Sequence, residues 1–128
     1  MAMADDDVTI EPGTYGPLTT TLTDTGNTLT IHGQAGAARP VISFSTAGQG
    51  FNLTGAGTSL SNVEADITGS GVGILASGFD INVDRVIGHA FGADSYGCLL
   101  VGMVTLTNSV CVADGFGTVV RGRGHLGC

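Results

Sequence analysis

A fixed spacing of 23 residues runs through the middle of this chain and constrains its fold more than any other feature. The spacing relates three sets of residues, which are Leu60/Val83/Leu106, Asn62/Arg85/Asn108 and Gly69/Gly92/Gly115. A period of about 20 to 50 residues is typical of repeat proteins, in which one structural unit stacks on the next. The spacing therefore predicts a coil that climbs one turn every 23 residues.

The segments between the repeated positions have the composition of strands and turns. Thr, Val, Ile and Leu alternate between 22 glycines, and no amphipathic stretch of helical period is present. Short strands of this kind also suit a β-sandwich. A stack of rungs is favoured, because it places residue i above residue i+23 and so explains the repeated side chains. The expected apolar strands are Phe51–Thr54, Gly73–Ala76 and Cys98–Val101, and the expected second strands are Thr58–Asp66, Phe79–Val86 and Val104–Val112.

The sequence predicts one folded domain preceded by an acidic tail. Residues 1–7 are rich in Asp and are expected to be disordered, and residues 8–128 are expected to form the β-helix domain. The loop Gly33–Pro40 is expected to break the 23-residue register. Residues 121–128 stop inside a fourth coil. We therefore expect a truncated helix whose uncapped C-terminal coil could associate end to end with another copy.

The charge of the chain excludes several partners. Eleven Asp or Glu residues stand against four Arg and no Lys, which gives a net charge of −7. A surface of that sign repels phosphate backbones and anionic lipids, so nucleic-acid binding is not expected. No apolar run is long enough to span a bilayer, and the N-terminus lacks the basic and apolar regions of a signal peptide. Membrane insertion is therefore not expected.

Three cysteines, Cys98, Cys111 and Cys128, allow one disulfide in three possible pairings and leave one thiol over. Their spacing matches no zinc template, and His125 does not complete one. We expect the cysteines to be buried as small hydrophobic residues, or two of them to form one disulfide, and we expect no metal site.

Three segments give the chain a family resemblance. They are the opening Val8-Thr-Ile-Glu-Pro-Gly-Thr-Tyr15, then Leu29-Thr-Ile-His-Gly33, and rungs such as Val104-Thr-Leu-Thr-Asn-Ser-Val110. Over residues 8–120 the chain resembles the N-terminal portion of a right-handed parallel β-helix protein of the pectate-lyase-like superfamily. The resemblance implies an all-β, right-handed single-stranded solenoid with about 22–24 residues per coil. It also implies an extracellular or cell-surface location.

The densest group of polar side chains lies in the second regular coil, at Asp80, Asp84, Arg85, His89 and Asp94. The register adds Asp66, which lies 23 residues before His89 and so about 4.8 Å away on a neighbouring rung. A carboxylate beside an imidazole raises the histidine pKa and fixes the tautomer, which suits a general acid or base. Arg85 stands where the neighbouring coils carry Asn, and its guanidinium could clamp a sugar carboxylate.

The resemblance gives these residues possible roles. Polysaccharide lyases of this fold use an Arg or Lys to abstract a proton next to a uronate, while acidic residues hold calcium. By resemblance, Arg85, His89 and Asp66 are candidates for catalysis, and Asp80 and Asp84 are candidates for substrate binding. If the protein is a lyase, Asp66, Asp80 and Asp84 could hold calcium, and no other cofactor is implied. The structural alternative makes Asp84–Arg85 a solvated turn pair and Asp66/His89 a ladder contact.

Two functions follow, because the superfamily hosts lyases, hydrolases, epimerases, adhesins and tailspikes. The first is a non-catalytic rung segment of a secreted or surface protein, either adhesin-like or the scaffold of a larger carbohydrate-active protein. The second is a polysaccharide lyase or hydrolase that acts on an acidic polysaccharide along the groove of the helix. We favour the first, because a catalytic groove usually needs more coils than this chain offers.

Overall fold

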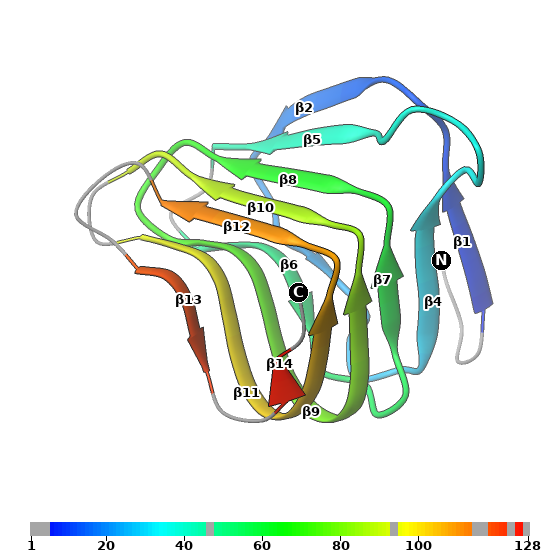
Figure 1. Cartoon of the computed structure of the whole chain (residues 1–128). Helices are drawn as coiled ribbons and strands as arrows, with labels where there is room; N and C mark the ends of the chain where they lie inside the picture. Colours follow the sequence, from blue (N-terminus) through cyan, green and yellow to red (C-terminus); the bar gives the residue numbers. More distant parts are fainter. Residues whose placement is uncertain (1–5, 46–47, 93–94, 114–117, 123–124, 127–128) are drawn as a thin grey trace.

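The computed structural model describes residues 6–45, 48–92, 95–113, 118–122 and 125–126. Within these residues the protein is all-β, with fourteen strands and no helix. The strand pairings of this part are parallel, and the strands stack as a solenoid of about four turns (Figure 1). The β-helix predicted from the 23-residue spacing is therefore confirmed. None of the described segments is a helix long and apolar enough to cross a membrane.

The turns contribute strands to two sheets, a large sheet of nine strands and a small sheet of five. The strands of the large sheet are β1 (Asp6–Ile10), β3 (Leu22–Thr23), β4 (Leu29–Gly33), β6 (Gln49–Leu53), β7 (Ser59–Ser61), β9 (Val72–Asp84), β11 (Tyr96–Thr107), β13 (Thr118–Gly122) and β14 (His125–Leu126). The strands of the small sheet are β2 (Thr14–Leu18), β5 (Val41–Phe44), β8 (Glu64–Ile67), β10 (Ile87–Ala90) and β12 (Val110–Ala113). In Figure 1 the small sheet is the upper layer, which the chain enters from the large sheet through a sharp corner.

The register of the strands explains the repeated side chains. Leu60 pairs with Val83, and Val83 pairs with Leu106, so these buried residues form one column at intervals of 23 residues. Between the earlier coils, Ile31 pairs with Leu60 at an interval of 29 residues, which is six more than 23. The loop Gly33–Pro40 lies within that interval and bulges out of the stack. The predicted break in register is therefore confirmed.

The first coil begins earlier than the sequence predicts. β1 starts at Asp6, and residues Asp6 and Asp7, which the sequence places in the acidic tail, pair with Leu29 and Thr30 of β4. The Asp7 carboxylate also contacts His32 of β4. Residues 1–5 lie outside the described part of the chain.

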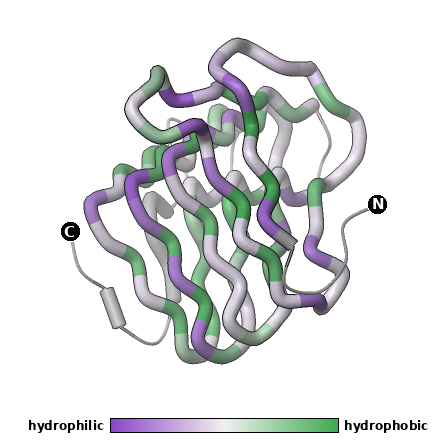
Figure 2. The backbone as a smooth tube through the Cα atoms, turned by 90° about the vertical axis from the view of Figure 1, so that its right-hand side faces the viewer, coloured by the Kyte–Doolittle hydropathy of each residue, from purple (hydrophilic) through white to green (hydrophobic). Residues whose placement is uncertain are grey.

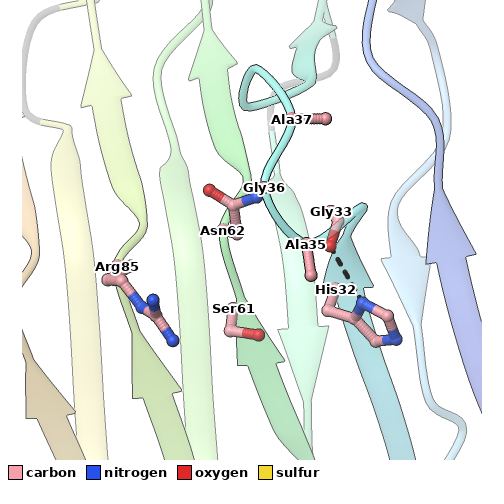
Figure 3. Close-up of a pocket in the computed structure, with 8 residues that line it drawn as sticks. All are labelled: His32, Gly33, Ala35, Gly36, Ala37, Ser61, Asn62 and Arg85. Carbon is pink, nitrogen blue, oxygen red and sulfur yellow. Dashed lines mark hydrogen bonds between the residues drawn. The ribbon is translucent and has the colours of Figure 1, made fainter.

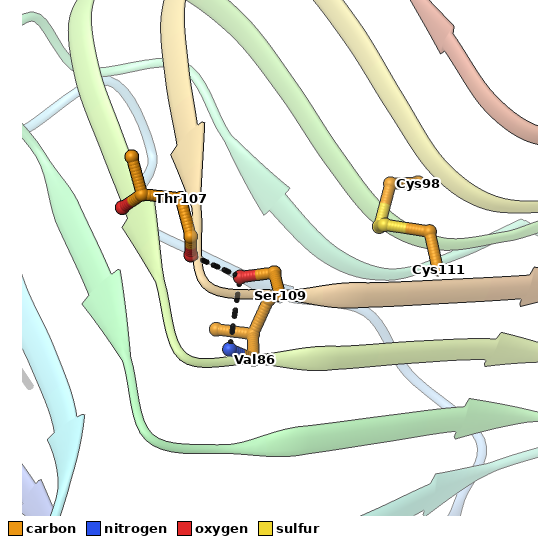
Figure 4. Close-up of a disulfide and its surroundings, with 5 residues drawn as sticks. All are labelled: Val86, Cys98, Thr107, Ser109 and Cys111. Carbon is orange, nitrogen blue, oxygen red and sulfur yellow. Dashed lines mark hydrogen bonds between the residues drawn. A yellow bond between two sulfur atoms is a disulfide. The ribbon is translucent and has the colours of Figure 1, made fainter. Parts of the chain in front are cut away.

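The expected second strands Thr58–Asp66 and Val104–Val112 are each two strands separated by a corner, and the expected strand Phe79–Val86 is the end of β9 followed by the corner itself. The corner residues Asn62, Arg85 and Asn108 have φ angles of 54°, 53° and 50°. This left-handed conformation ends the extended backbone and turns the chain from the large sheet into the small one. Ser109 stabilises its corner by donating from Oγ to the Thr107 carbonyl (2.7 Å) and accepting from the Val86 N–H of the coil below (3.1 Å) (Figure 4).

The turn expected between the apolar strand and the second strand of each regular coil is also absent in two coils. β9 and β11 run unbroken from Val72 to Asp84 and from Tyr96 to Thr107, and they bend without ending. The bend coincides with a β-bulge, where the pairing shifts between Met103 and Val104. Asp80 is the extra residue of β9 and has a φ of 58°. A bulge bends a strand without breaking the ladder, which is why the sequence pattern resembles a turn here.

The core fills the space between the two sheets. Strands β5, β8 and β10 each alternate a partly exposed with a buried residue, as strands with one buried face do. Figure 2 shows the matching alternation of hydrophilic and hydrophobic segments along neighbouring strands. The fully buried side chains of this core include Phe44, Phe51, Leu53, Leu60, Ile67, Ile74, Ile81, Leu100 and Leu106. Each such side chain contributes about 1.5–3 kcal/mol on burial, so packing dominates the stability of the stack.

The two sheets approach closely at one narrow place. A Cβ atom added to Gly88 of β10 would lie 2.8 Å from Cys98 Sγ, and one added to Gly97 would lie 2.6 Å from the Gly88 carbonyl oxygen. Only glycine leaves room for the backbones at this distance. Cys98 of β11 and Cys111 of β12 form a disulfide across the same place, with a Cα–Cα distance of 5.7 Å (Figure 4). Of the three possible pairings, the structure therefore has Cys98–Cys111, and Cys128 lies outside the described residues.

A buried carboxylate ties the first two coils together. Asp24 is 1% exposed and follows β3. Its oxygens accept hydrogen bonds from the backbone N–H of Gly26 (3.1 Å), Thr54 (3.0 Å) and Gly55 (2.8 Å). The Thr58 hydroxyl donates to it as well (2.9 Å). The sequence gives Asp24 only the role of a loop residue, and this connection between coils was not predicted.

Candidate functional site

The predicted pair Asp84 and Arg85 lies at the corner between β9 and β10. The Asp84 carboxylate accepts hydrogen bonds from Thr107 Oγ1 (2.8 Å) and Asn108 Nδ2 (3.1 Å) of the next coil and from Arg85 Nε (3.0 Å). The bonds from Thr107 and Asn108, followed by the contact with Arg85, hold the pKa of Asp84 below its ordinary value. Three of its acceptor sites are thus used within the corner.

Arg85 also lines a shallow pocket of about 200 Å³ beside this corner. The pocket spans three coils, because His32 of β4 pairs with Ser61 of β7, and Ser61 pairs with Asp84 of β9. Its other lining residues are Gly33, Ala35, Gly36, Ala37 and Asn62, which come from the inserted loop and from a corner. Figure 3 shows Arg85 and His32 on opposite sides, with Ser61 and Asn62 between them.

His32 is held at the rim of this pocket by two acceptors. Its Nδ1 lies 2.9 Å from the Gly33 carbonyl, and its Nε2 lies 2.6 Å from the Asp7 carboxylate. The hydrogen bond with the Gly33 carbonyl, opposed by burial and supported by Asp7, raises the pKa of His32 above its ordinary value. The protonated ring donates to both groups at once. The pocket therefore places two basic side chains opposite each other.

The predicted pair Asp66 and His89 lies elsewhere, on the outer face of the small sheet. Asp66 of β8 is the register partner of His89 of β10, so the predicted juxtaposition is confirmed. Glu64 lies two residues before Asp66, on the same face of β8. One ligand-type atom from each of these three side chains lies within 4.8 Å of the others. We call this group the small-sheet triad. Strand periodicity alone could have added Glu64, because residues i and i+2 share a face.

The two carboxyl groups of the small-sheet triad repel each other. Burial, followed by the hydrogen bond with Asp66 and the repulsion of its charge, raises the pKa of Glu64 to about 6, although His89 and Arg39 act in the opposite direction. The Oδ1 atom of Asp66 is buried and has no hydrogen-bond partner among the described residues. The His89 ring stacks on Phe91, with ring centroids 3.9 Å apart and an interplanar angle of 26°. Two carboxyl groups and one imidazole therefore share a small surface.

The predicted site residues thus occupy three separate places. Asp84 and Arg85 are at the corner, Asp66 and His89 belong to the small-sheet triad, and Asp80 is at the bulge of the large sheet. Asp80 is exposed and follows Phe79, whose exposed fraction is 68%. The other member of the predicted cluster, Asp94, lies outside the described residues.

The chemistry open to these places differs. The corner pocket presents the guanidinium of Arg85, a group that suits a carboxylate or sulfate. The small-sheet triad can exchange protons, or it can offer oxygen and nitrogen ligands to a metal ion. The chain matches no protein-family model, and comparison with curated proteins and with solved structures finds no match.

Proposed function

We propose that this chain is a non-catalytic rung segment of a secreted or cell-surface β-helix protein. Its role would be adhesin-like, or that of a scaffold in a larger carbohydrate-active protein of the pectate-lyase-like kind that it resembles. The observation that carries this proposal is that Asp84 and Arg85 hold the corner together. Asp84 accepts from Thr107, Asn108 and Arg85, and Arg85 occupies the left-handed corner position.

The same geometry argues against the lyase roles of these residues. A lyase base needs a free nitrogen to take a proton from the substrate. Arg85 Nε lies 3.0 Å from the Asp84 carboxylate and donates to it, so this nitrogen is already engaged within the corner. The candidate calcium ligands Asp66, Asp80 and Asp84 lie at three different places, whereas calcium needs six to eight oxygen ligands around one point.

The disulfide supports the proposed location. Cys98 and Cys111 are bridged, and such bonds persist in oxidising compartments and on cell surfaces but are rare in the cytosol. The alternating, in-register strands also give the rigid, extended surface that a scaffold requires.

A direct assay tests the proposal. The full chain is incubated with polygalacturonate and alginate, with and without calcium, and both the unsaturated uronate product and new reducing ends are measured. We expect neither product above the level of an Arg85→Ala variant. Cleavage by the wild-type protein that Arg85→Ala abolishes would overturn the non-catalytic function and establish the lyase.

A second candidate is recognition and processing of an acidic polysaccharide, and the pocket beside Arg85 favours it. Arg85 and His32 lie on opposite sides of a pocket of about 200 Å³, on a protein whose net charge is −7. Affinity electrophoresis in gels that contain polygalacturonate, with a neutral dextran gel as control, measures this binding. Retardation that is specific to the acidic polymer and lost in Arg85→Gln would support the second candidate. Equal mobility in both gels would exclude recognition of the acidic polysaccharide.

A further inference from the structure

We propose that Glu64, Asp66 and His89 form a binding site for a divalent transition-metal ion, for which Zn²⁺ is the best probe. This site goes beyond the scaffold function, and it departs from the sequence-based expectation of no metal site. The sequence suggests only the pair Asp66 and His89, because Glu64 is not singled out by the 23-residue register.

The backbone holds the three ligands on one rigid surface. Glu64 and Asp66 project from the same face of β8, and His89 lies opposite Asp66 on β10. Neighbouring strands are about 4.8 Å apart, and both of these strands lie inside the small sheet, between β5 and β12. The site therefore does not depend on a loop, and its ligand spacing is fixed by the ladder.

The spacing of the ligand atoms is close to that of a metal site. The three atoms lie within 4.8 Å of one another. Two ligands that each bind zinc at about 2.1 Å in tetrahedral geometry are about 3.4 Å apart. The side chains must therefore close by up to about 1.4 Å, which rotation about their own bonds can supply.

The site also contains a polar atom that lacks a partner. Asp66 Oδ1 is buried and accepts no hydrogen bond from the part of the chain that the structure describes, and a buried acceptor of this kind is costly. A cation bound between the carboxylates would satisfy this oxygen and would remove the repulsion between Glu64 and Asp66. Arg39 acts on Glu64 from a distance, and the overall charge of −7 attracts cations to the surface.

The donor set selects the class of metal. An imidazole nitrogen suits zinc and the other first-row transition metals, whereas calcium requires more oxygen ligands than two carboxylates provide. Stacking on Phe91 restricts rotation of the His89 ring. Three protein ligands would leave further coordination positions to water or to a bound molecule, as in open zinc sites.

Calorimetric titration of the full chain, after dialysis against a chelator, tests the proposal. We expect one Zn²⁺ per chain and much weaker binding of Ca²⁺. Each of Glu64→Gln, Asp66→Asn and His89→Gln should weaken Zn²⁺ binding at least tenfold. Asp80→Asn is the matched control, because it removes the same charge from an exposed carboxylate on the other sheet and should leave the affinity unchanged.

A second measurement keeps the proposal testable if a variant folds poorly. Co²⁺ bound to the wild-type chain should give visible absorption bands of a site with nitrogen and oxygen ligands, and Zn²⁺ should displace it. Failure of the wild-type chain to bind Zn²⁺ stoichiometrically would overturn the proposal. So would a preference for Ca²⁺, or binding that survives all three substitutions but is lost in His32→Gln, which would place the ion at the His32–Asp7 pair.

Discussion

At the scale of single residues, the carboxylate of Asp24 shows how strongly one polar side chain can bind two coils together. It is buried, and it accepts hydrogen bonds from donors in two coils. Gly26 belongs to the same coil as Asp24, and Thr54, Gly55 and Thr58 belong to the next one. Such bonds are worth more than neutral ones because the acceptor is charged. The side chain therefore acts as a fixed link rather than a surface charge.

We predict that Asp24→Asn lowers the free energy of unfolding by about 2–4 kcal/mol. The amide nitrogen of Asn would face backbone N–H groups of Thr54 and Gly55, so donors would be left without an acceptor. Urea unfolding of the two proteins measures the difference. The control is Asp80→Asn, which removes the same charge at an exposed bulge and should change stability by less than about 0.5 kcal/mol. Equal effects of the two substitutions would refute the link.

The pKa of Asp24 predicts a pH dependence. Burial opposes ionisation, but the bonds from Gly55, Thr54, Gly26 and Thr58 outweigh it and hold the pKa below its ordinary value of 3.8. The unfolded chain therefore takes up the proton first as the pH falls. This contribution to stability is present above about pH 5 and is lost progressively below it, as the pH falls through the lower, folded-state pKa. The free energy of unfolding of the wild type should approach that of Asp24→Asn between about pH 5 and pH 2. Parallel curves would contradict the lowered pKa.

At the scale of the elements, the corner is the feature that sets the shape of each coil. Asn62, Arg85 and Asn108 stack at the same position, and all three adopt the left-handed backbone. Asn adopts this conformation readily, because its short polar side chain can bond locally. Arg85 is the exception among the three. Its contact with Asp84 compensates for the less suitable residue type.

We predict opposite effects for two substitutions of Arg85. Arg85→Val should lower the free energy of unfolding by about 1–2 kcal/mol, because a β-branched residue is unfavourable with positive φ. Arg85→Asn should leave stability unchanged or raise it by a few tenths of a kcal/mol, since it restores the residue of the neighbouring coils. Thermal unfolding of both variants measures this. If Asn destabilises as much as Val, the Arg85–Asp84 contact and not the backbone governs the corner.

The sequence predicts the stack of coils better than it predicts the site. The 23-residue period sets which residues are neighbours, so the columns of Leu60 and Val83, and of Asp66 and His89, follow from arithmetic. It does not predict how far apart two points along one coil are. The cluster of Asp80, Asp84 and His89 in the sequence is therefore divided among a bulge, a corner and the small sheet. Asp24 and Glu64 are missed because neither belongs to a repeated position.

At the scale of the whole molecule, the disulfide joins the two sheets of one coil where Gly88 and Gly97 let them approach closely. Cys98 and Cys111 are 13 residues apart and belong to different sheets. Closing a loop of that length in the unfolded chain contributes about 3 kcal/mol in the chain-entropy account. The bond thus contributes noticeably to a fold of 128 residues that is held mainly by packing.

We predict that reduction of this bond lowers the free energy of unfolding by about 3 kcal/mol, and that Cys98→Ala/Cys111→Ala reproduces the loss in the absence of reductant. Alkylation of the unreduced, denatured chain should label one cysteine of the three, and mass spectrometry should identify it as Cys128. A label on Cys98 or Cys111 would show that the bond does not form. Protein made in an oxidising compartment is the appropriate material, because the bond is not expected to persist in the cytosol.

The register of the coils has a consequence for how such a gene can change length. Because residue i faces residue i+23 in the small sheet from β5 to β12 and in the second halves of β9 and β11, duplication or deletion of one 23-codon unit keeps the buried columns of these strands in phase. The six extra residues near Gly33–Pro40 instead leave the stack, whereas the single extra residue Asp80 is taken up within β9 as a bulge. A gene of this kind can therefore lengthen the protein by whole coils, and it can accept insertions of other lengths at loops and bulges. The loop beside Arg85 is an insertion of this second kind.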